Sequence, residues 1–210
     1  MKRISIYLFI SVWFCLFIIS IVWGGIYPIH LQYRPLRKFP SLQQKLGSTL
    51  GITPFEDQRS DKRYIGHYIS PRKVSNYFKS DPFPLETAIV DSLSQTLSQY
   101  GVQTIPISNW DRKPESIKNI EVDSIMKVEI KRFWIGGEAI RSRTKINTWV
   151  YFVIHLGVKK EGKVFTRNVY VGKEEMVSKL TPEKIEQMVN QILTEVFDSF
   201  FSNPYEISPK

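Results

Sequence analysis

The 210-residue chain has very little cysteine and histidine, and this scarcity excludes several kinds of site. Cys15 is its only cysteine, so no intramolecular disulfide can form. Trp13 and Phe14 precede Cys15 where a lipidated cysteine needs a small neighbour, so lipidation is not expected. The three histidines are far apart, and none has metal-ligand spacing with another. We therefore predict neither a metal site nor a disulfide framework.

Motifs for catalysis are also absent from the sequence. There is no G-x-S-x-G elbow, no phosphate-binding loop and no dinucleotide fingerprint. Glu56, Asp57 and Asp61 cluster, but basic residues are interleaved with them, which favours a local ion-pair network over acid–base chemistry. We predict that the protein is not an enzyme and needs no cofactor.

Acidic residues are fewer than basic ones, and the formal net charge is +9. A basic domain with interleaved aromatic residues can bind nucleic acid, but no nucleic-acid motif is present. The same charge suits a protein that faces anionic lipid or polysaccharide. A nucleic-acid-binding domain tethered to the cytoplasmic face is therefore kept only as an alternative.

One long stretch, from Ile4 to Ile26, has no charged side chain. About 20 apolar residues can cross a bilayer, and this run is longer than the roughly 7–15 apolar residues of a signal peptide. We therefore predict an N-terminal transmembrane helix in residues 1–27 that acts as a signal-anchor. Tyr27 and Tyr33 would lie in the interfacial aromatic belt. The sequence does not decide whether the segment is cleaved.

Basic residues on both sides of this stretch bear on its orientation. Lys2 and Arg3 favour a cytoplasmic N-terminus, whereas Arg34, Arg37 and Lys38 oppose it. The short N-terminal tail favours the first arrangement. The predicted localisation is a single-pass protein of the inner membrane with its main domain in the periplasm.

The rest of the chain divides into three parts. Three prolines among basic side chains predict a stiff linker over residues 28–45. Residues 46–203 form the predicted periplasmic domain, and residues 204–210 form a C-terminal tail.

Hydrophobic periodicity within residues 46–203 indicates the fold class. Apolar residues at helical spacing predict two amphipathic helices, from Leu85 to Gly101 and from Thr181 to Phe200. The strictest alternation in the chain runs from Ile146 to Val158, where every second residue is apolar except Thr148, and this predicts a strand with one core face. Gly136-Gly137 predicts a loop before that strand. The expected fold is an α+β two-layer sandwich, in which the two helices pack on one mainly antiparallel sheet.

Aromatic side chains remain on the second face of the long predicted strand. If both helices cover the first face, Trp149 and Tyr151 are left exposed, and large exposed aromatic patches usually mark binding surfaces. The alternative is that the chain before the first helix folds over them. The candidate partner-binding residues are Trp134, Trp149, Tyr151, Arg141 and Arg143.

A short motif and the order of elements carry a family resemblance. The motif is Ile52-Thr53-Pro54-Phe55 followed by Glu56-Asp57-Gln58-Arg59, and Ile65-Gly66 comes shortly after it. With the helices and hairpins from Leu85 to Phe200, the chain beyond the linker resembles the YajG-like and ABC-transport auxiliary lipoproteins of bacterial envelopes. The resemblance implies a non-enzymatic periplasmic domain, a sheet packed by two helices, that serves a larger envelope or lipid-transport assembly. The chain departs from that family in lacking a lipobox.

The predicted function is a non-enzymatic, membrane-anchored accessory protein of the cell envelope, an auxiliary component of a transport or envelope assembly. An enzyme acting on envelope material is the other alternative beside nucleic-acid binding. The expected partners are the membrane, through the N-terminal helix, and an envelope protein or lipid. A homo-oligomer is compatible with the sequence, which names neither the cargo nor the stoichiometry.

Overall fold

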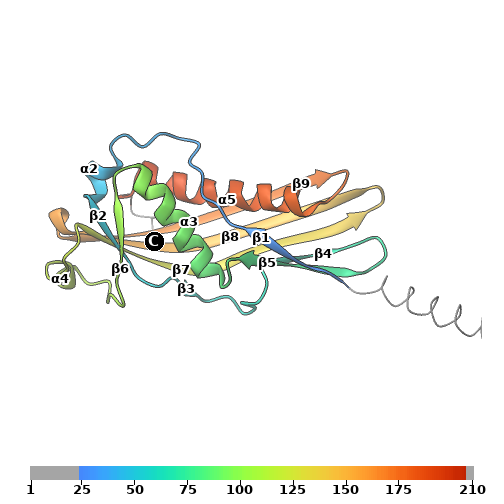
Figure 1. The fold of residues 1–210 in the computed structure, drawn as a ribbon, viewed down its shortest axis with the longest axis horizontal. Helices are drawn as coiled ribbons and strands as arrows, with labels where there is room; N and C mark the ends of the chain where they lie inside the picture. The colour runs from blue at the N-terminus through green and yellow to red at the C-terminus, as the bar shows by residue number, and fades with distance from the viewer. Residues whose placement is uncertain (1–23, 207–210) are drawn as a thin grey trace, which may run out of the picture.

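Three long antiparallel strands, β7 (Ser124–Ile140), β8 (Arg143–Val158) and β9 (Lys163–Val177), form the body of the sheet (Figure 1). They belong to a computed structural model that describes residues 24–206. Val150, Phe152 and Ile154 are fully buried, as the strict alternation along β8 predicts. A single-turn helix, η1 (Lys159–Glu161), closes the second hairpin.

Short strands line the free edge of β7 in chain order. These are β2 (Thr49–Ile52), β3 (Glu56–Asp57) and β4 (Gly66–Ile69), and each runs parallel to β7. Outside them lie β6 (Gln103–Pro106) on β2, β5 (Ser75–Asp81) on β4, and β1 (Ile26–His30) on β5. The long pairings are therefore antiparallel, as predicted, whereas most of the short ones are parallel.

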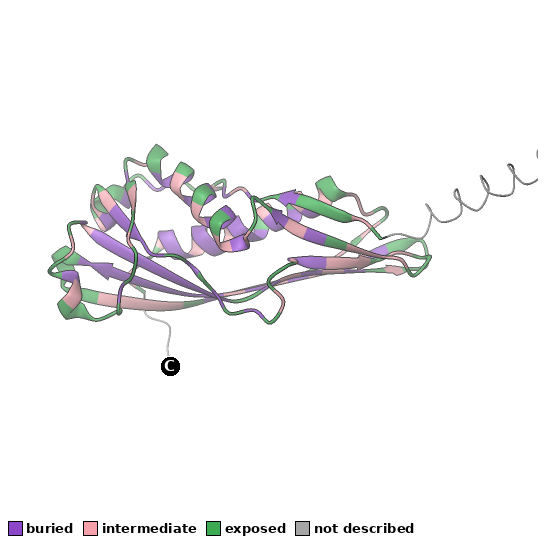
Figure 2. Ribbon diagram, turned by 60° about the horizontal axis from the view of Figure 1, so that its bottom comes forward, coloured by how far each residue is buried: buried purple, intermediate pink, exposed green. Residues whose placement is uncertain are grey.

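Both long helices pack on one face of this sheet, which confirms the predicted two-layer arrangement (Figure 2). They are α3 (Leu85–Gln99) and α5 (Pro182–Ser202); α2 (Leu42–Leu46) and α4 (Pro114–Ile117) are short. At the start of α5, the hydroxyl of Thr181 accepts a hydrogen bond from the backbone N–H of Lys184. Gly101, with φ of +74°, follows the end of α3.

The segment predicted as a linker, residues 28–45, is instead built into the domain. Tyr33 is 2% exposed, and its hydroxyl donates to Asp198 of α5 at 2.9 Å. Burial and this carboxylate raise the pKa of Tyr33 well above its ordinary value. On the other side, Thr96 of α3 donates to the carbonyl of Tyr33 at 2.7 Å. The segment thus bridges the two helices, and Tyr33 lies in the core rather than in an interfacial belt.

The prediction of a single-pass inner-membrane protein with a periplasmic main domain also needs correction. Between Gly24 and Glu206, no helix is both long and apolar enough to cross a bilayer. Ile26 and Tyr27, the last residues assigned to the membrane helix, lie in β1 and pair with β5. Pro28 is tolerated there because β1 is an edge strand. The rest of the predicted helix lies in residues 1–23, outside the described residues.

The predicted loop at Gly136-Gly137 is a third correction, because both glycines lie within β7, which continues to Ile140. A Cβ at Gly137 would approach the ring of Tyr68 to 3.1 Å and the side chain of Leu180 to 3.3 Å. The glycine therefore makes room for packing between the sheet and its neighbours, and the turn comes only at residues 141–142.

Candidate partner-binding face of the sheet

The sheet face opposite the helices is covered at one end only. Residues 107–122, which include α4 and which we call the cover segment, fold over this end and bury Trp110 and Ile117 against Ile125. A Cβ at Gly157 would lie 2.8 Å from the Trp110 ring, so that glycine makes room for the indole. The covering chain thus follows the first helix instead of preceding it, and it lies over Gly157 rather than over the predicted aromatic residues.

The other end of this face carries a row of aromatic side chains across β5, β4, β7, β8 and β9, which we call the aromatic band. Ring centroids lie 5.5 Å apart for His67 and Trp134, and 6.0 Å apart for Trp149 and Tyr170. Trp134 and Trp149 are directly opposite each other in the β7–β8 register. Tyr170 is 58% exposed, so the row is open to solvent. The members of the band are Tyr64, His67, Tyr77, Trp134, Trp149, Tyr151 and Tyr170.

A β-bulge in β7 places two cations beside the band. The register shifts between Ile130 and Arg132, because two residues of β7 oppose one of β8 at this point. The guanidinium of Arg132 lies 5.4 Å from the centroid of the Trp149 ring, in cation–π geometry. Lys131 turns to the neighbouring Glu129, with N and O 2.6 Å apart.

A glycine on β9 determines how Trp149 lies. Gly172 is the register partner of Trp149, and a Cβ there would come within 2.7 Å of the indole ring. Trp149 therefore rests over a strand position that has no side chain. The ring thus lies close to the β9 strand, and it remains partly exposed to solvent.

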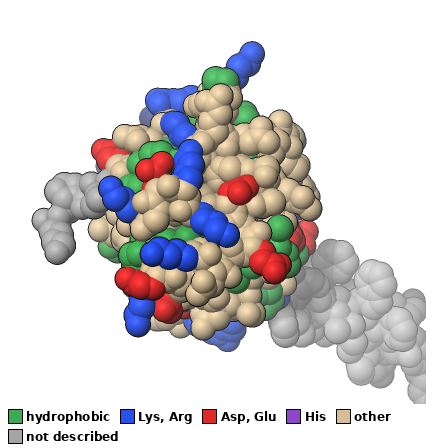
Figure 3. Space-filling view, turned by 90° about the vertical axis from the view of Figure 1, so that its left-hand side faces the viewer, with side chains coloured by type: hydrophobic (Ala, Val, Ile, Leu, Met, Phe, Trp, Pro, Cys, Tyr) green, Lys and Arg blue, Asp and Glu red, His purple; other side chains and the backbone are tan. Residues whose placement is uncertain are grey.

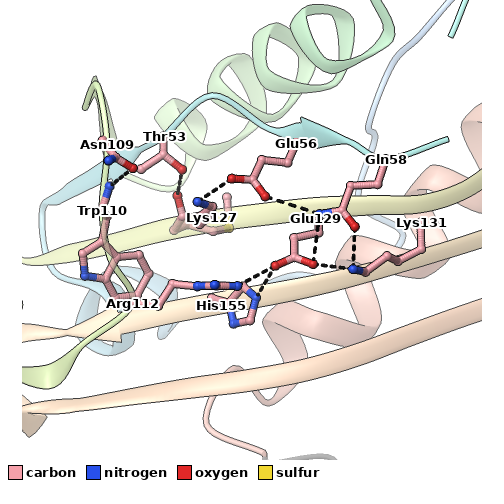
Figure 4. A network of polar contacts seen from close by, with 11 residues as sticks. Thr53, Glu56, Gln58, Asn109, Trp110, Arg112, Lys127, Glu129, Lys131 and His155 are labelled. Carbon is pink, nitrogen blue, oxygen red and sulfur yellow. Dashed lines mark hydrogen bonds and ion pairs between the residues drawn. The ribbon is translucent and has the colours of Figure 1, made fainter.

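A charged network lies between the cover segment and the band (Figure 4). Its centre is Glu129, whose side chain is 8% exposed and accepts from Arg112 at 2.6 Å, Lys131 at 2.6 Å and His155 at 3.2 Å. Burial alone raises the pKa of Glu129, but the hydrogen bonds from Lys131 and His155 outweigh it, so the pKa is lowered. Because Arg112 belongs to the cover segment, the network ties that segment to the sheet.

His155 completes this network. Desolvation lowers the pKa of His155 below its ordinary value, and the hydrogen bond to Glu129 only partly opposes this. A neutral ring protonated at Nε2 satisfies both contacts, since Nδ1 then accepts from Thr166 Oγ1 at 2.9 Å. Two cations already bind the carboxylate of Glu129, so it is poorly placed to stabilise an imidazolium. Through Arg112, the group holds the cover segment against the sheet.

The acidic cluster near residue 57 forms ion pairs, as predicted. Asp57 and Arg59 are both buried, with a side-chain N and O 2.7 Å apart, and Asp61 lies 3.7 Å from Arg63. The guanidinium of Arg59 also donates to the carbonyl of Tyr64 at 2.8 Å, which fixes the loop beside the band. A pocket opens between this loop and the bulge. It is lined by Arg59, Ser60, Asp61, Lys131, Arg132, Phe133 and Trp134.

The structure separates the five predicted site residues into two groups. Trp134, Trp149 and Tyr151 lie together in the band. Arg141 and Arg143 lie at the β7–β8 turn, six or more residues from Trp149 along the strand, which is roughly 20 Å at about 3.3 Å per residue.

Several members of the band were missed by the sequence analysis. His67 and Tyr77 belong to β4 and β5, which have little alternation of apolar and polar residues. Tyr170 carries a usable signal, because pairing the last two long strands from their hairpin turn places it opposite Tyr151. The fold therefore defines a one-sided α+β sandwich with an open aromatic sheet face.

Comparisons with known proteins agree on the fold. No protein-family model matches the chain, and no curated protein matches it. Protein XCC0632 from Xanthomonas campestris, described with the family model DUF330, is a similar solved structure with a TM-score of 0.55 and 14% identity. The match covers 86% of this chain and 94% of that one. At this identity the likeness shows a shared fold.

Two bacterial lipoproteins are among the other similar solved structures. Lipoprotein GNA1162 from Neisseria meningitidis is 12% identical with a TM-score of 0.39, over 71% of this chain and 98% of that one. A minor lipoprotein from Acinetobacter baumannii is 9% identical with a TM-score of 0.37, over 77% and 98% of the two chains.

Proposed function

We propose that this chain is a non-catalytic accessory protein of the bacterial cell envelope that binds a protein partner through the aromatic band. It would serve a transport or envelope assembly, as the resemblance to the YajG-like and ABC-transport auxiliary lipoproteins implies. The observation that carries the proposal is the row of seven aromatic rings on an uncovered sheet face.

The composition of the band supports a protein partner. Trp, Tyr and Arg are the residues most enriched among those that dominate binding energy at protein interfaces. Here Arg132 stacks on Trp149, and Tyr170 is more than half exposed. Monomeric proteins rarely leave such patches open without a function.

The shape of the band points the same way. Small-molecule sites are concave and bury most of their ligand. The band instead follows the surface of a sheet across five strands, with the pocket near Arg59 at its margin. A broad, gently twisted face suits another protein surface better than a small ligand.

The nucleic-acid alternative finds little support in the charges. Lys127 binds Glu56 with N and O 2.5 Å apart, and Lys145 binds Glu174 at 2.9 Å. With Lys131 on Glu129, three lysines of β7 and β8 are already neutralised, which interrupts any stripe of charge for phosphates along these strands. The enzyme alternative is weakened by the two cations on Glu129.

A site-specific crosslink tests the proposal. A photo-crosslinking residue replaces Tyr170 in cells that make the protein naturally, and a second variant carries it at Lys163, at the other end of β9. We expect a discrete protein adduct from position 170 only, and identification of an envelope protein within it.

The control is the double substitution Trp149→Ala with Tyr151→Ala. The position-170 adduct should vanish in this background while circular dichroism and the unfolding midpoint stay close to those of the parent. An adduct that survives the double substitution, or equal adducts from positions 170 and 163, would contradict the proposal.

A further inference from the structure

One end of the sheet, which we call the tip, brings together three segments that are distant in sequence. They are the start of β1 at residues 24–27, the β4–β5 turn at residues 70–74 and the β7–β8 turn at residues 140–143. A Cβ at Gly24 would clash with the carbonyl of Ser75, so the first described residues run directly against β5. Ile69 is opposite Glu138 in the β4–β7 register, which places the two turns side by side.

Exposed apolar side chains are concentrated at the tip. Nine large apolar side chains are exposed among residues 24–206, and five of them lie in the last few residues of strands that end here, with exposed fractions of 37–58%. These five are Ile26, Tyr27, Ile69, Ile140 and Met176. Scattered apolar side chains are normal on a surface, but a concentration at one end is not.

Unpaired cations surround this apolar group. Arg72, Lys73, Arg141 and Arg143 are exposed, and none has an ion pair within the described chain. The nearest acidic side chains do not neutralise them. Glu174 is bound to Lys145, and Glu138 lies opposite the same lysine in the register.

The opposite end of the molecule has a different surface. Figure 3 looks onto that end and shows Lys and Arg side chains interspersed with Asp and Glu. Two of its lysines are also engaged, since Lys159 donates to the carbonyl of Ile120 and Lys160 to that of Gln44. Among residues 24–206, Leu36 beside Arg37 and Lys38 repeats this combination for a single apolar side chain, whereas the tip brings five such side chains together with its unpaired cations.

We propose that the tip docks on the surface of a bilayer that contains anionic phospholipids. The apolar side chains would enter the boundary between head groups and acyl chains, while the arginines and Lys73 contact lipid phosphates. The sequence next to the tip supports a bilayer as the binding partner. The first described residue, Gly24, lies within the tip, and the sequence before Gly24 has no charged side chain from Ile4 onward. The inference is independent of the aromatic band.

A fluorophore that reports local polarity tests the proposal in the full chain. With Cys15 replaced by Ser, the label is attached to a cysteine introduced by Ser142→Cys at the tip, or by Glu161→Cys at the opposite end. Each protein is mixed with vesicles of phosphatidylcholine alone or with about one third phosphatidylglycerol. Insertion of the apolar N-terminal sequence would by itself bring the tip label close to either kind of vesicle. The contribution of the tip's cations is therefore measured by the difference between the two vesicle compositions and by the loss of that difference when Arg141 and Arg143 are substituted.

The tip label should shift to the blue and be quenched by lipid-borne quenchers on the anionic vesicles, and 1 M salt should reverse this. At roughly fivefold per cation, R141N with R143T should weaken the response about 25-fold. Asn tolerates the left-handed conformation of residue 141, where φ is +55°. The matched control, K113S with K118S at the opposite end, should change nothing.

Two results would overturn the proposal. One is an equal response of the labels at positions 142 and 161. The other is a tip label whose fluorescence does not change with anionic vesicles but which is protected in native envelopes. That result would assign the tip to a protein partner instead.

Discussion

The two halves of the helix-free sheet face are built from the same strands, but one half is covered by the chain and the other is open to solvent. Near Gly157, the cover segment buries Trp110 to 4% exposure and adds a small second core. Toward the tip, Trp149 and Trp134 lie on the same β7–β8 hairpin without such a cover. The comparison teaches that a tryptophan on this face is not in itself a core or a binding residue. What decides its role is whether a loop reaches it.

The network around Glu129 marks the boundary between the two halves. Arg112 reaches it from the cover segment, and Lys131 reaches it from the bulge beside the band. Along β8, the helix-free face runs from Trp149 and Tyr151, past His155, to Gly157. The cover segment therefore ends where the charges begin, and the band starts beyond them.

The largest expected difference between the halves is in stability. Trp110→Ala should lower the free energy of unfolding by about 3–5 kcal/mol, because it empties a packed site. Trp149→Ala removes a partly exposed ring and one cation–π contact, and should cost about 1 kcal/mol or less. Urea denaturation of both variants measures the contrast. Similar losses would mean that the band is part of the core.

A smaller effect is expected at the boundary. Glu129→Gln should lower the free energy of unfolding by about 1–3 kcal/mol, because Arg112 and Lys131 lose their charged acceptor. Glu138→Gln, on the same strand, is the matched control and should stay within about 0.5 kcal/mol. Faster proteolysis within residues 107–122 of the first variant would show that the cover segment has loosened. Unchanged proteolysis would argue against this tethering role.

His155 should make stability depend on pH. Its pKa is lower in the folded state than the ordinary value of 6.5, so the unfolded chain binds more protons at mildly acidic pH. The stability that the neutral imidazole contributes is complete above pH 6.5 and is lost as the pH falls below 6.5 toward the pKa of the folded state. Unfolding midpoints measured from pH 7.5 to 5 should decline, and His155→Gln should flatten the decline. A steeper decline in the variant would contradict the account.

The smallest effect is expected at Gly172, the β9 residue that lies against the Trp149 ring. Gly172→Ala should displace the indole, because the new Cβ would lie 2.7 Å from the ring, while stability changes by about 0.5 kcal/mol or less. Gly136→Ala is the control, because its Cβ would have 3.9 Å of clearance. The indole N–H resonance of Trp149 should move in the first variant only. Equal shifts in both would refute the contact.

The local elements of the fold could be predicted from the sequence, and the long-range pairings could not. The helices and the β8 alternation depend on spacing within one segment, so they are visible in the sequence. The parallel pairing of β2, β3 and β4 depends on the distant edge of β7. The glycine pair looked like a loop because the need for a small residue at Gly137 comes from Tyr68 and Leu180, which are distant in sequence, and not from the local chain.

The candidate site was predictable to the same extent. Trp149 and Tyr151 share a face by period-two alternation, and this prediction needs no partner strand. Tyr77 and His67 join them only through parallel pairing of β4 with β7. Arg141 and Arg143 looked like neighbours of Trp149 because the strand was expected to end near Gly136, whereas it continues to Ile140.

Hydroxyl-radical footprinting of the full chain tests the central claim most directly. In purified protein, Trp149, Tyr151 and Tyr170 should be oxidised readily, and Trp110 should be spared under the cover segment. In intact envelopes of the native cells, the three band residues should become protected, while the partly exposed Tyr205 at the far end of the sheet keeps the reactivity that it has in the purified protein. Band residues that oxidise equally in both preparations would contradict a partner on this face.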